Sequence, residues 1–266
     1  MSISRKSFLV ALLSVARLTG VAAVQADQTF DFNSPVVTGS SQAPGVWYTD
    51  RYAPAGFASP VFFDGDNRLL HSISAADGAD NRPGSFSGAF YNTQGRKYDL
   101  EAATVKMSID LYIPANWATT GARMAGFWGT AVDATDAVSA YPIVEFTSDA
   151  ATPRFRAWEA NGTWIDMGLP SGFAYDSWQT LEIAKLASGE FKYTVGDLTA
   201  TTTMMGPASV EIANVILQGH NSQAGVSYDI HWDNLSTSLV PEPASLAMVG
   251  SGLLGLIAVR RRASRA

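Results

Sequence analysis

Short runs in which apolar and polar residues alternate dominate the middle of the chain. In the clearest run, residues 105–113, apolar side chains occupy the odd positions and Pro114 ends the pattern. A period of two predicts a β-strand with one buried face. Similar runs predict further strands over residues 29–33, 123–129, 142–147, 154–160, 180–185, 190–195, 210–218 and 227–237.

The spacing of these runs indicates the fold class. Turn signals separate the strands about every ten residues, and Ser188-Gly189 predicts a hairpin between two of them. Outside the two ends of the chain no segment has a convincing helical period. We therefore expect an all-β chain folded as an antiparallel β-sandwich. Residues 47–98 are rich in Pro and Gly and predict short strands joined by long surface loops.

The first 26 residues have the pattern of a secretory signal peptide. Arg5 and Lys6 precede an apolar stretch, and a small-residue region ends at Ala26. Cleavage after Ala26 is the expected processing step, although Arg17 lies at the end of the apolar stretch.

The last 27 residues combine a rigid break, an apolar run and a basic cluster. Two prolines prevent a continuous helix or central strand at the break. The apolar run, residues 246–259, would span about 21 Å as a single helix, less than the roughly 30 Å of a hydrocarbon core. That deficit favours a temporary membrane anchor over a permanent one. The break consists of Pro241, Glu242 and Pro243, and the cluster of Arg260, Arg261 and Arg262.

This order of features at a C-terminus resembles the PEP-CTERM sorting signal of Gram-negative, exopolysaccharide-producing bacteria. The resemblance implies a transient anchor in the inner membrane, with the arginines as a cytoplasmic stop. It further implies recognition by an exosortase, removal of the tail, and delivery to the cell surface or extracellular matrix. The chain thus divides into a signal peptide (1–26), a β-sandwich domain (27–239) and a sorting tail (240–266).

Charge is unevenly distributed between the domain and the two ends. The ends hold seven of the 18 basic residues and one of the 24 acidic residues, so residues 27–239 carry 11 basic and 23 acidic side chains, a net charge of −12. An acidic domain argues against nucleic acid as a partner. It argues equally against a polyanionic polysaccharide as the main partner, and it suits a neutral polysaccharide, a cation or simply solubility. The chain has no cysteine, which excludes disulfides and thiolate chemistry.

Two segments resemble a known fold family. Residues 178–185 and 191–196 resemble a strand pair of the laminin-G-like, concanavalin-like jelly roll, and Asp233-Asn234-Leu235 is similar to the last strand of secreted glycan-associated sandwiches. In such sandwiches an acidic residue near the first strand and one in the last share a structural Ca²⁺. The resemblance implies Asp31 and Asp233 as that pair, with a solvated strand face as the alternative.

Turns rich in Asp and Gly give a second calcium candidate. Residues 64–67 and 77–81 place oxygen ligands of the kind that Ca²⁺ prefers on such turns. Neither segment fits a twelve-residue EF-hand loop, and ordinary turns use the same residues.

The sequence offers no recognisable catalytic pattern. A glycosidase needs two carboxylates about 5 to 10 Å apart, and the jelly-roll hydrolases carry them on one strand as Glu-x-Asp-x-x-Glu. Here Glu145, Glu159 and Glu182 stand singly in predicted strands, near Arg154 and Arg156. A buried Glu paired with Arg is structural at least as often as catalytic. We therefore assign no catalytic residue.

Aromatic residues provide the candidate binding surface. Sugar rings stack on exposed Trp and Tyr, with a few polar groups for the hydroxyls. Alternation places Trp158 on the strand face opposite Phe155, and Trp178 and Trp232 are expected in the core. The candidates for glycan binding are Trp47, Tyr48, Trp117, Arg156, Trp158 and Trp164.

Taken together, the sequence predicts an exported, exosortase-sorted protein of the cell envelope or matrix. Its sandwich is expected to be a non-catalytic glycan-binding module associated with exopolysaccharide. Two alternatives stay open: a glycoside hydrolase or lyase on the same jelly roll, and a purely structural matrix protein.

Overall fold

The computed structural model describes residues 27–78, 81–159, 162–202, 208–221 and 226–239. The expected signal peptide, C-terminal hydrophobic helix and sorting motif lie outside these ranges. Within them, no helix is both long and apolar enough to cross a membrane.

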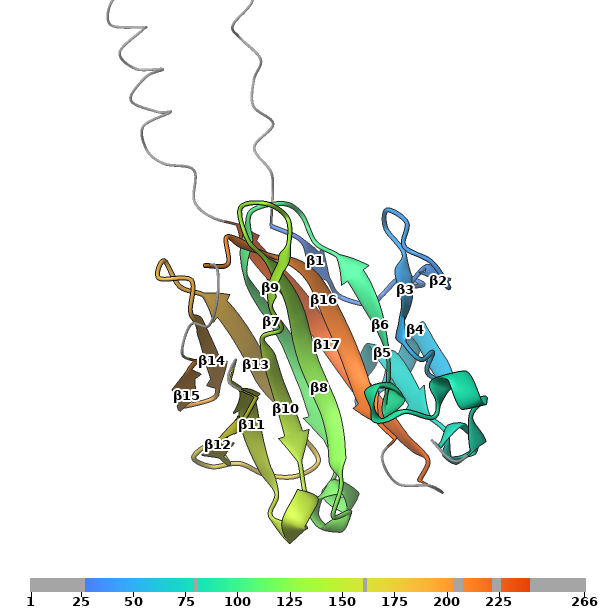
Figure 1. Cartoon of the computed structure of the whole chain (residues 1–266). Coiled ribbons are helices and arrows are strands. Elements are labelled where there is room, and N and C mark those ends of the chain that lie inside the picture. Colours follow the sequence, from blue (N-terminus) through green and yellow to red (C-terminus); the bar gives the residue numbers. More distant parts are fainter. Residues whose placement is uncertain (1–26, 79–80, 160–161, 203–207, 222–225, 240–266) are drawn as a thin grey trace, which may run out of the picture.

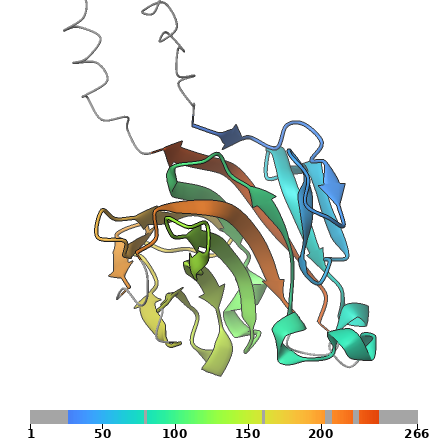
Figure 2. The same ribbon diagram turned by 45° about the horizontal axis from the view of Figure 1, so that its top comes forward.

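The described residues form two stacked β-sheets (Figures 1 and 2). We call sheet A the one with strand order β15 (Leu198–Thr201), β14 (Phe191–Val195), β13 (Ser177–Lys185), β7 (Thr104–Ile113), β17 (Tyr228–Leu239), β5 (Asp66–Ile73) and β4 (Gly56–Phe63), with β1 (Thr29–Phe30) also paired to β17. Sheet B has the order β12 (Trp164–Gly168), β11 (Arg154–Trp158), β10 (Ile143–Thr147), β8 (Arg123–Val132), β16 (Glu211–His220), β6 (Thr93–Asp99), β3 (Trp47–Arg51) and β2 (Thr38–Gly39), with β9 (Val138–Ala140) paired to β8.

Nearly all strand pairs are antiparallel, β2 with β3 being parallel. The connecting segments contain the short 3₁₀ helices η1 (Ala75–Asp77), η3 (Gly84–Phe86), η4 (Ala89–Tyr91), η5 (Ala115–Thr119) and η6 (Asp149–Ala151). The architecture is the jelly-roll-like, all-β sandwich that the sequence predicts.

The hydrophobic core lies between the sheets. Alternation along β7 directs Ile109 and Leu111 inward, where they belong to one buried cluster with Phe127 of β8, Phe146 of β10 and Phe155 of β11. The predicted hairpin is confirmed, since Lys185 of β13 pairs with Phe191 of β14 across a turn that contains Gly189 at φ 88°.

Between residues 47 and 98 the prediction of short strands is wrong for β4 and β5, whereas the predicted long connection is present between β5 and β6. β4 and β5 are eight residues each and form a long hairpin, followed by β6. Pro60 is tolerated because β4 is the edge strand of sheet A and its register shifts between Ala58 and Val61. Alternation is hard to recognise in β4 because its exposed positions, Ala58, Pro60 and Phe62, are not polar.

The two ends of the described domain lie together. Phe30 of β1 pairs with Leu235 of β17, and the backbone N–H of Leu239 donates to the carboxylate of Asp27 at 3.2 Å. The chain therefore enters and leaves the sandwich at the same end (Figure 1).

The two tryptophans that the sequence assigns to the core differ in their burial. Trp232 is fully buried. Trp178 is only half-buried, and its indole N–H donates to Asp64 at 2.8 Å. Because Leu181 points inward on β13, a residue three positions earlier points to the outer face of sheet A. The prediction for Trp178 is therefore wrong.

Candidate functional site

A groove of about 560 Å³ opens on the outer face of sheet B. Trp128, Ile143 and Ile216 form a small buried cluster there, apart from the main core, and Trp158 and Trp164 pack against it. The volume falls in the range of small-molecule sites. The lining residues are Arg51, Arg123, Trp128, Tyr141, Ile143, Trp158, Gly162 and Trp164.

The aromatic wall of the groove is a cross-strand pair. Trp158 of β11 is the register partner of Trp164 of β12, and the two rings meet edge to face with centroids 4.9 Å apart. Phe155 and Ala157 point into the core, so Trp158 points out. Both indoles are half-buried, and the Tyr141 side chain is 49% exposed. The wall therefore combines ring faces with access to solvent.

Trp128 forms the floor of the groove. A Cβ atom at Gly126, two residues earlier, would lie 2.3 Å from the indole Nε1 of Trp128, so the ring can lie across that position only because it is a glycine. Trp128 is 3% exposed, and its Nε1 has no hydrogen-bond partner among the described residues. The floor therefore presents the indole ring, while the N–H is buried over Gly126.

Arg51 closes the groove on the side of β3. This residue has a positive φ of 59°, and its guanidinium lies 4.6 Å from the ring centre of Trp128 and 4.5 Å from that of Phe90. Its Nη1 donates to the hydroxyl of Thr93 at 3.1 Å. Stacking between two rings and this hydrogen bond hold the charge in place.

Arg123 reaches the same groove through an irregularity in β8. Phe146 pairs with Ala125 and Thr147 pairs with Arg123, so one extra residue, Met124, is accommodated between them. This bulge places Arg123 on the outer face beside Glu145 of β10. The guanidinium of Arg123 also lies 5.1 Å from the ring centre of Trp164.

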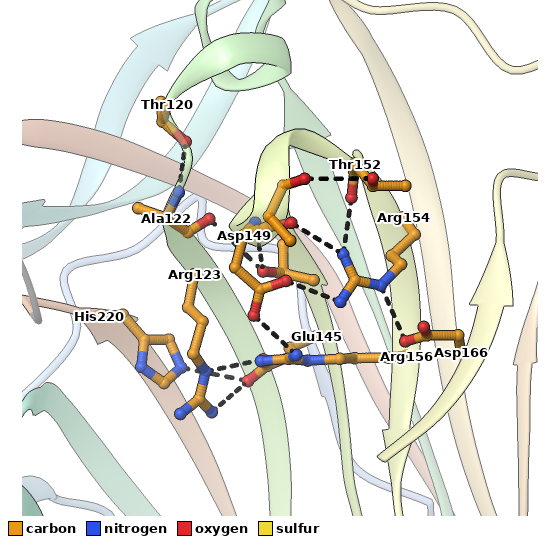
Figure 3. A network of polar contacts seen from close by, with 12 residues as sticks. Thr120, Ala122, Arg123, Glu145, Asp149, Thr152, Arg154, Arg156, Asp166 and His220 are labelled. Atoms are coloured by element: carbon orange, nitrogen blue, oxygen red, sulfur yellow. Dashed lines mark hydrogen bonds and ion pairs between the residues drawn. The ribbon is translucent and has the colours of Figure 1, made fainter.

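Glu145 belongs to a network of polar contacts with Arg123, Arg156 and His220 (Figure 3). Its carboxylate is fully buried and accepts two hydrogen bonds from Arg123, at 2.9 and 2.8 Å. Arg156 of β11 donates to it at 2.8 Å, and His220 Nε2 of β16 lies 3.1 Å away. Burial opposes ionisation, but the hydrogen bond from His220 and the charge and hydrogen bonds of Arg123 outweigh it, and the pKa of Glu145 lies below its ordinary range.

His220 is neutral near neutral pH. Burial lowers its pKa, and this effect exceeds the opposing influence of Glu145. A neutral imidazole beside a carboxylate donates its Nε2 hydrogen to that carboxylate. The two arginines therefore supply the positive charge that keeps Glu145 ionised.

Further ion pairs fix Arg156. Its Nη1 donates to Asp149 at 2.8 Å, and Asp149 also pairs with Arg154 at 2.7 Å. Arg154 in turn pairs with Asp166 of β12 at 2.8 Å. This ladder, visible in Figure 3, ties β10, β11 and β12 together, and the guanidinium of Arg156 lies 4.2 Å from the ring centre of Trp164.

The sequence candidates for glycan binding fall into two groups. Arg156, Trp158 and Trp164 come together beside the groove. Trp47 and Trp117 are each 1% exposed and belong to the core, so neither indole offers a face to a ligand. Tyr48 is 9% exposed, and its hydroxyl donates to Asp99 at 2.7 Å, outside the lining of the groove.

Sequence reasoning missed six of the lining residues, among them the four with polar or aromatic side chains: Arg51, Arg123, Trp128 and Tyr141. Plain alternation along residues 123–129 puts Arg123 and Trp128 on opposite faces, and only the bulge at Met124 brings them to the same one. An aromatic residue with a glycine two positions earlier on the same strand face was the available signal for Trp128.

The carboxylates considered as calcium ligands contact other groups of the protein. Asp233 pairs with Arg68, which supplies the positive charge there, and Asp31 accepts the backbone N–H of Asn33. Across the described ranges no group of three or more His, Asp or Glu side chains could hold a metal. Asp64 and Gly65, at φ 49° and 84°, form the tight turn of the β4–β5 hairpin. Of the other loop, residues 79–80 lie outside the described ranges.

The three isolated glutamates of the predicted strands all contact other groups of the protein. Glu145 is saturated by arginines, Glu182 pairs with Lys106 at 2.5 Å, and Glu159 accepts the hydroxyl of Thr163 at 3.2 Å. The described residues that line the groove include no carboxylate.

The C-terminal residues match a known sorting signal. Residues 239–262 match the model of the PEP-CTERM protein-sorting motif. This match indicates export with a membrane-anchored sorting signal, and it implies processing by an exosortase.

Solved structures resemble the sandwich at low sequence identity. An endo-1,3-β-glucanase from Streptomyces sioyaensis shares 13% identity, with 80% of this chain and 96% of the glucanase covered, at a TM-score of 0.46. Cellulose induced protein Cip1 shares 11% identity, with 79% and 96% covered, at a TM-score of 0.46. A carbohydrate esterase from Shiga toxin-encoding bacteriophage phi24B shares 13%, with 73% and 90% covered, at 0.45. No curated protein sequence matches the chain.

Proposed function

We propose that this chain is a non-catalytic glycan-binding protein that an exosortase releases or attaches at the surface, or in the extracellular matrix, of a Gram-negative bacterium. The saccharide binds in the groove on the outer face of sheet B. The observation that carries the proposal is the half-buried Trp158–Trp164 pair, which forms one wall of a groove of about 560 Å³. A signal peptide ending at Ala26 delivers the chain to the inner membrane.

Binding fits the groove better than hydrolysis does. A glycosidase places two carboxylates on either side of the scissile bond, and the described lining contains aromatic and guanidinium groups instead. The buried carboxylate nearest to it, Glu145, is held ionised by two arginines and cannot serve as a general acid at neutral pH. Ring faces beside fixed hydrogen-bond donors are the usual means of holding a sugar.

Replacing Trp158 with Ala is expected to weaken glycan binding about tenfold or more, because a stacking face worth about 1.5 kcal/mol is lost. Trp158→Phe, which keeps a ring, should retain much of the affinity. The measurement is affinity electrophoresis of the full-length chain in neutral detergent micelles, against a panel of neutral and acidic polysaccharides.

The matched control is Trp178→Ala. Trp178 is also half-buried, but on the outer face of sheet A. Equal retention of wild type and Trp158→Ala on every retained polysaccharide would refute the proposed site. If a folded wild-type sample is retained by none of them, the binding function itself is wrong.

A second prediction concerns the sorting tail. Changing Glu242 to Ala within the Pro-Glu-Pro motif should block processing, so that the uncut chain accumulates in the membrane fraction. Mass spectrometry of the fractionated protein from an exosortase-producing host measures this directly. Arg265→Gln is the control because it lies beyond the matched residues 239–262. Normal processing of Glu242→Ala would contradict the role of the motif.

A further inference from the structure

We propose that the groove selects acidic saccharides, whose carboxylate groups bind between Arg51 and Arg123. This inference rests on the proposed function and specifies its ligand. It runs against the expectation from net charge, which favours a neutral polysaccharide. The charge of the side chains around the groove, and not the net charge of the domain, determines which ligand the groove prefers.

The charged side chains that line the groove in the described part of the chain are both arginines. They come from β3 and β8, which are not neighbours in sheet B, because β16 and β6 lie between them. The carboxylates that balance them lie behind the lining. Glu145 is fully buried under Arg123, and the Asp50 carboxylate, 18% exposed, lies 3.7 Å from Arg51. A ligand therefore meets guanidinium groups first.

Each of these guanidinium groups keeps one terminal nitrogen that contacts no partner among the described residues. Arg123 uses Nε and Nη2 for Glu145, which leaves Nη1 unused among its contacts with described residues. Arg51 uses Nη1 for Thr93 and holds Nε toward Asp50, and its Nη2 has no contact of this kind with the described chain. Both groups are held by stacking and ion pairing, so little side-chain entropy is lost when a ligand binds.

The floor holds one of these donors in place, since the Trp128 ring stacks under Arg51. Fixed N–H donors from two arginine side chains need an acceptor-rich ligand. A sugar hydroxyl also donates a hydrogen and would find few acceptors here, whereas a carboxylate only accepts.

The negative charge of the domain does not prevent this selection. At physiological ionic strength the Debye length is about 8 Å, so carboxylates elsewhere on the surface are largely screened. A guanidinium in direct contact with a carboxylate, within a partly desolvated groove, keeps most of its interaction energy. Trp158 and Trp164 then provide the ring face beside the bound carboxylate.

The test compares each acidic oligosaccharide with its own carboxyl-reduced form. Oligomers of galacturonate, glucuronate and mannuronate, and the same oligomers with carboxyl groups reduced to alcohols, are titrated calorimetrically into the full-length chain in neutral detergent at 0.15 M salt. At least one acidic oligomer should bind about tenfold more tightly than its reduced form, as expected for one charge-assisted hydrogen bond.

Arg51→Gln should remove that preference while thermal unfolding still shows a folded protein. Lys192→Gln makes the same charge change at an exposed position of β14 in sheet A, and it should leave the preference unchanged. Equal binding of acidic and reduced forms, or an unchanged preference in Arg51→Gln, would overturn the inference and leave glycan binding standing. Failure to bind any oligosaccharide would overturn both.

Discussion

Glu145→Gln should lower the free energy of unfolding by about 3–5 kcal/mol, the largest effect that we expect from a single substitution. The carboxylate of Glu145 is fully buried and contacts Arg123, Arg156 and His220. Gln keeps the shape but removes the charge and one acceptor oxygen. The Arg156 side chain is only 6% exposed, so water cannot replace the lost partner.

Urea unfolding at pH 7 measures this effect, and Glu182→Gln is the matched control. Glu182 also stands singly in a strand and pairs with a basic residue, Lys106, but both side chains are partly exposed, at 28% and 43%. Exposed pairs contribute between zero and about 1 kcal/mol. Similar losses in the two variants would show that the buried carboxylate does not organise this side of sheet B.

Acid should destabilise the protein well before its carboxylates are protonated, and His71 is the main cause. His71 is fully buried, its Nε2 lies 3.1 Å from the carbonyl oxygen of Gln94, and its Nδ1 has no partner in the described structure. Burial lowers the pKa of His71 to about 3. The folded protein therefore keeps this imidazole neutral where an unfolded chain would protonate it.

The sign and the pH window follow from that difference. Well above a pH of about 6.5 both states are neutral and the stability is complete. As pH falls toward 3 only the unfolded chain takes up the proton, so stability is lost. Between pH 7 and 5 the loss from His71 is about 2 kcal/mol. Burial also lowers the pKa of His220 and of His231, and both add losses of the same sign.

His71→Gln isolates the contribution of His71, because a Gln side chain can still donate to Gln94 without titrating. The difference in unfolding free energy between wild type and His71→Gln should change by about 2 kcal/mol between pH 7 and 5. A constant difference would contradict the assignment. If the variant does not fold, NMR titration of the three histidines provides the test, since His71 should stay neutral at pH 5.

How much of this site the sequence could predict depends on the strand. On β11, alternation correctly directs Trp158 away from the core, and it places Arg156 on the same face. On β8, alternation fails because the bulge at Met124 changes the face of Arg123. Trp47 and Trp117 show a different limit, since an indole beside polar turn residues has the same sequence signature whether it is buried or exposed.

Distance along the chain sets another limit. Arg51, Arg123, Glu145 and His220 are far apart in sequence and meet only through the order of strands in sheet B. Strand order depends on how whole sheets bury their apolar faces against each other, and local pattern does not encode it. The same limit applies to charge, because composition gives the net charge of the domain but not which charged side chains line the groove.

The sequence by itself determined the all-β class and the sorting tail. Both are local properties: a period of two along short runs, and a Pro-Glu-Pro motif, an apolar run and arginines in one order. The tertiary structure decided which aromatic residues face solvent, which arginines share a groove and which carboxylate is buried beneath them. These depend on register, bulges and strand order, which are set by packing between residues distant in the sequence.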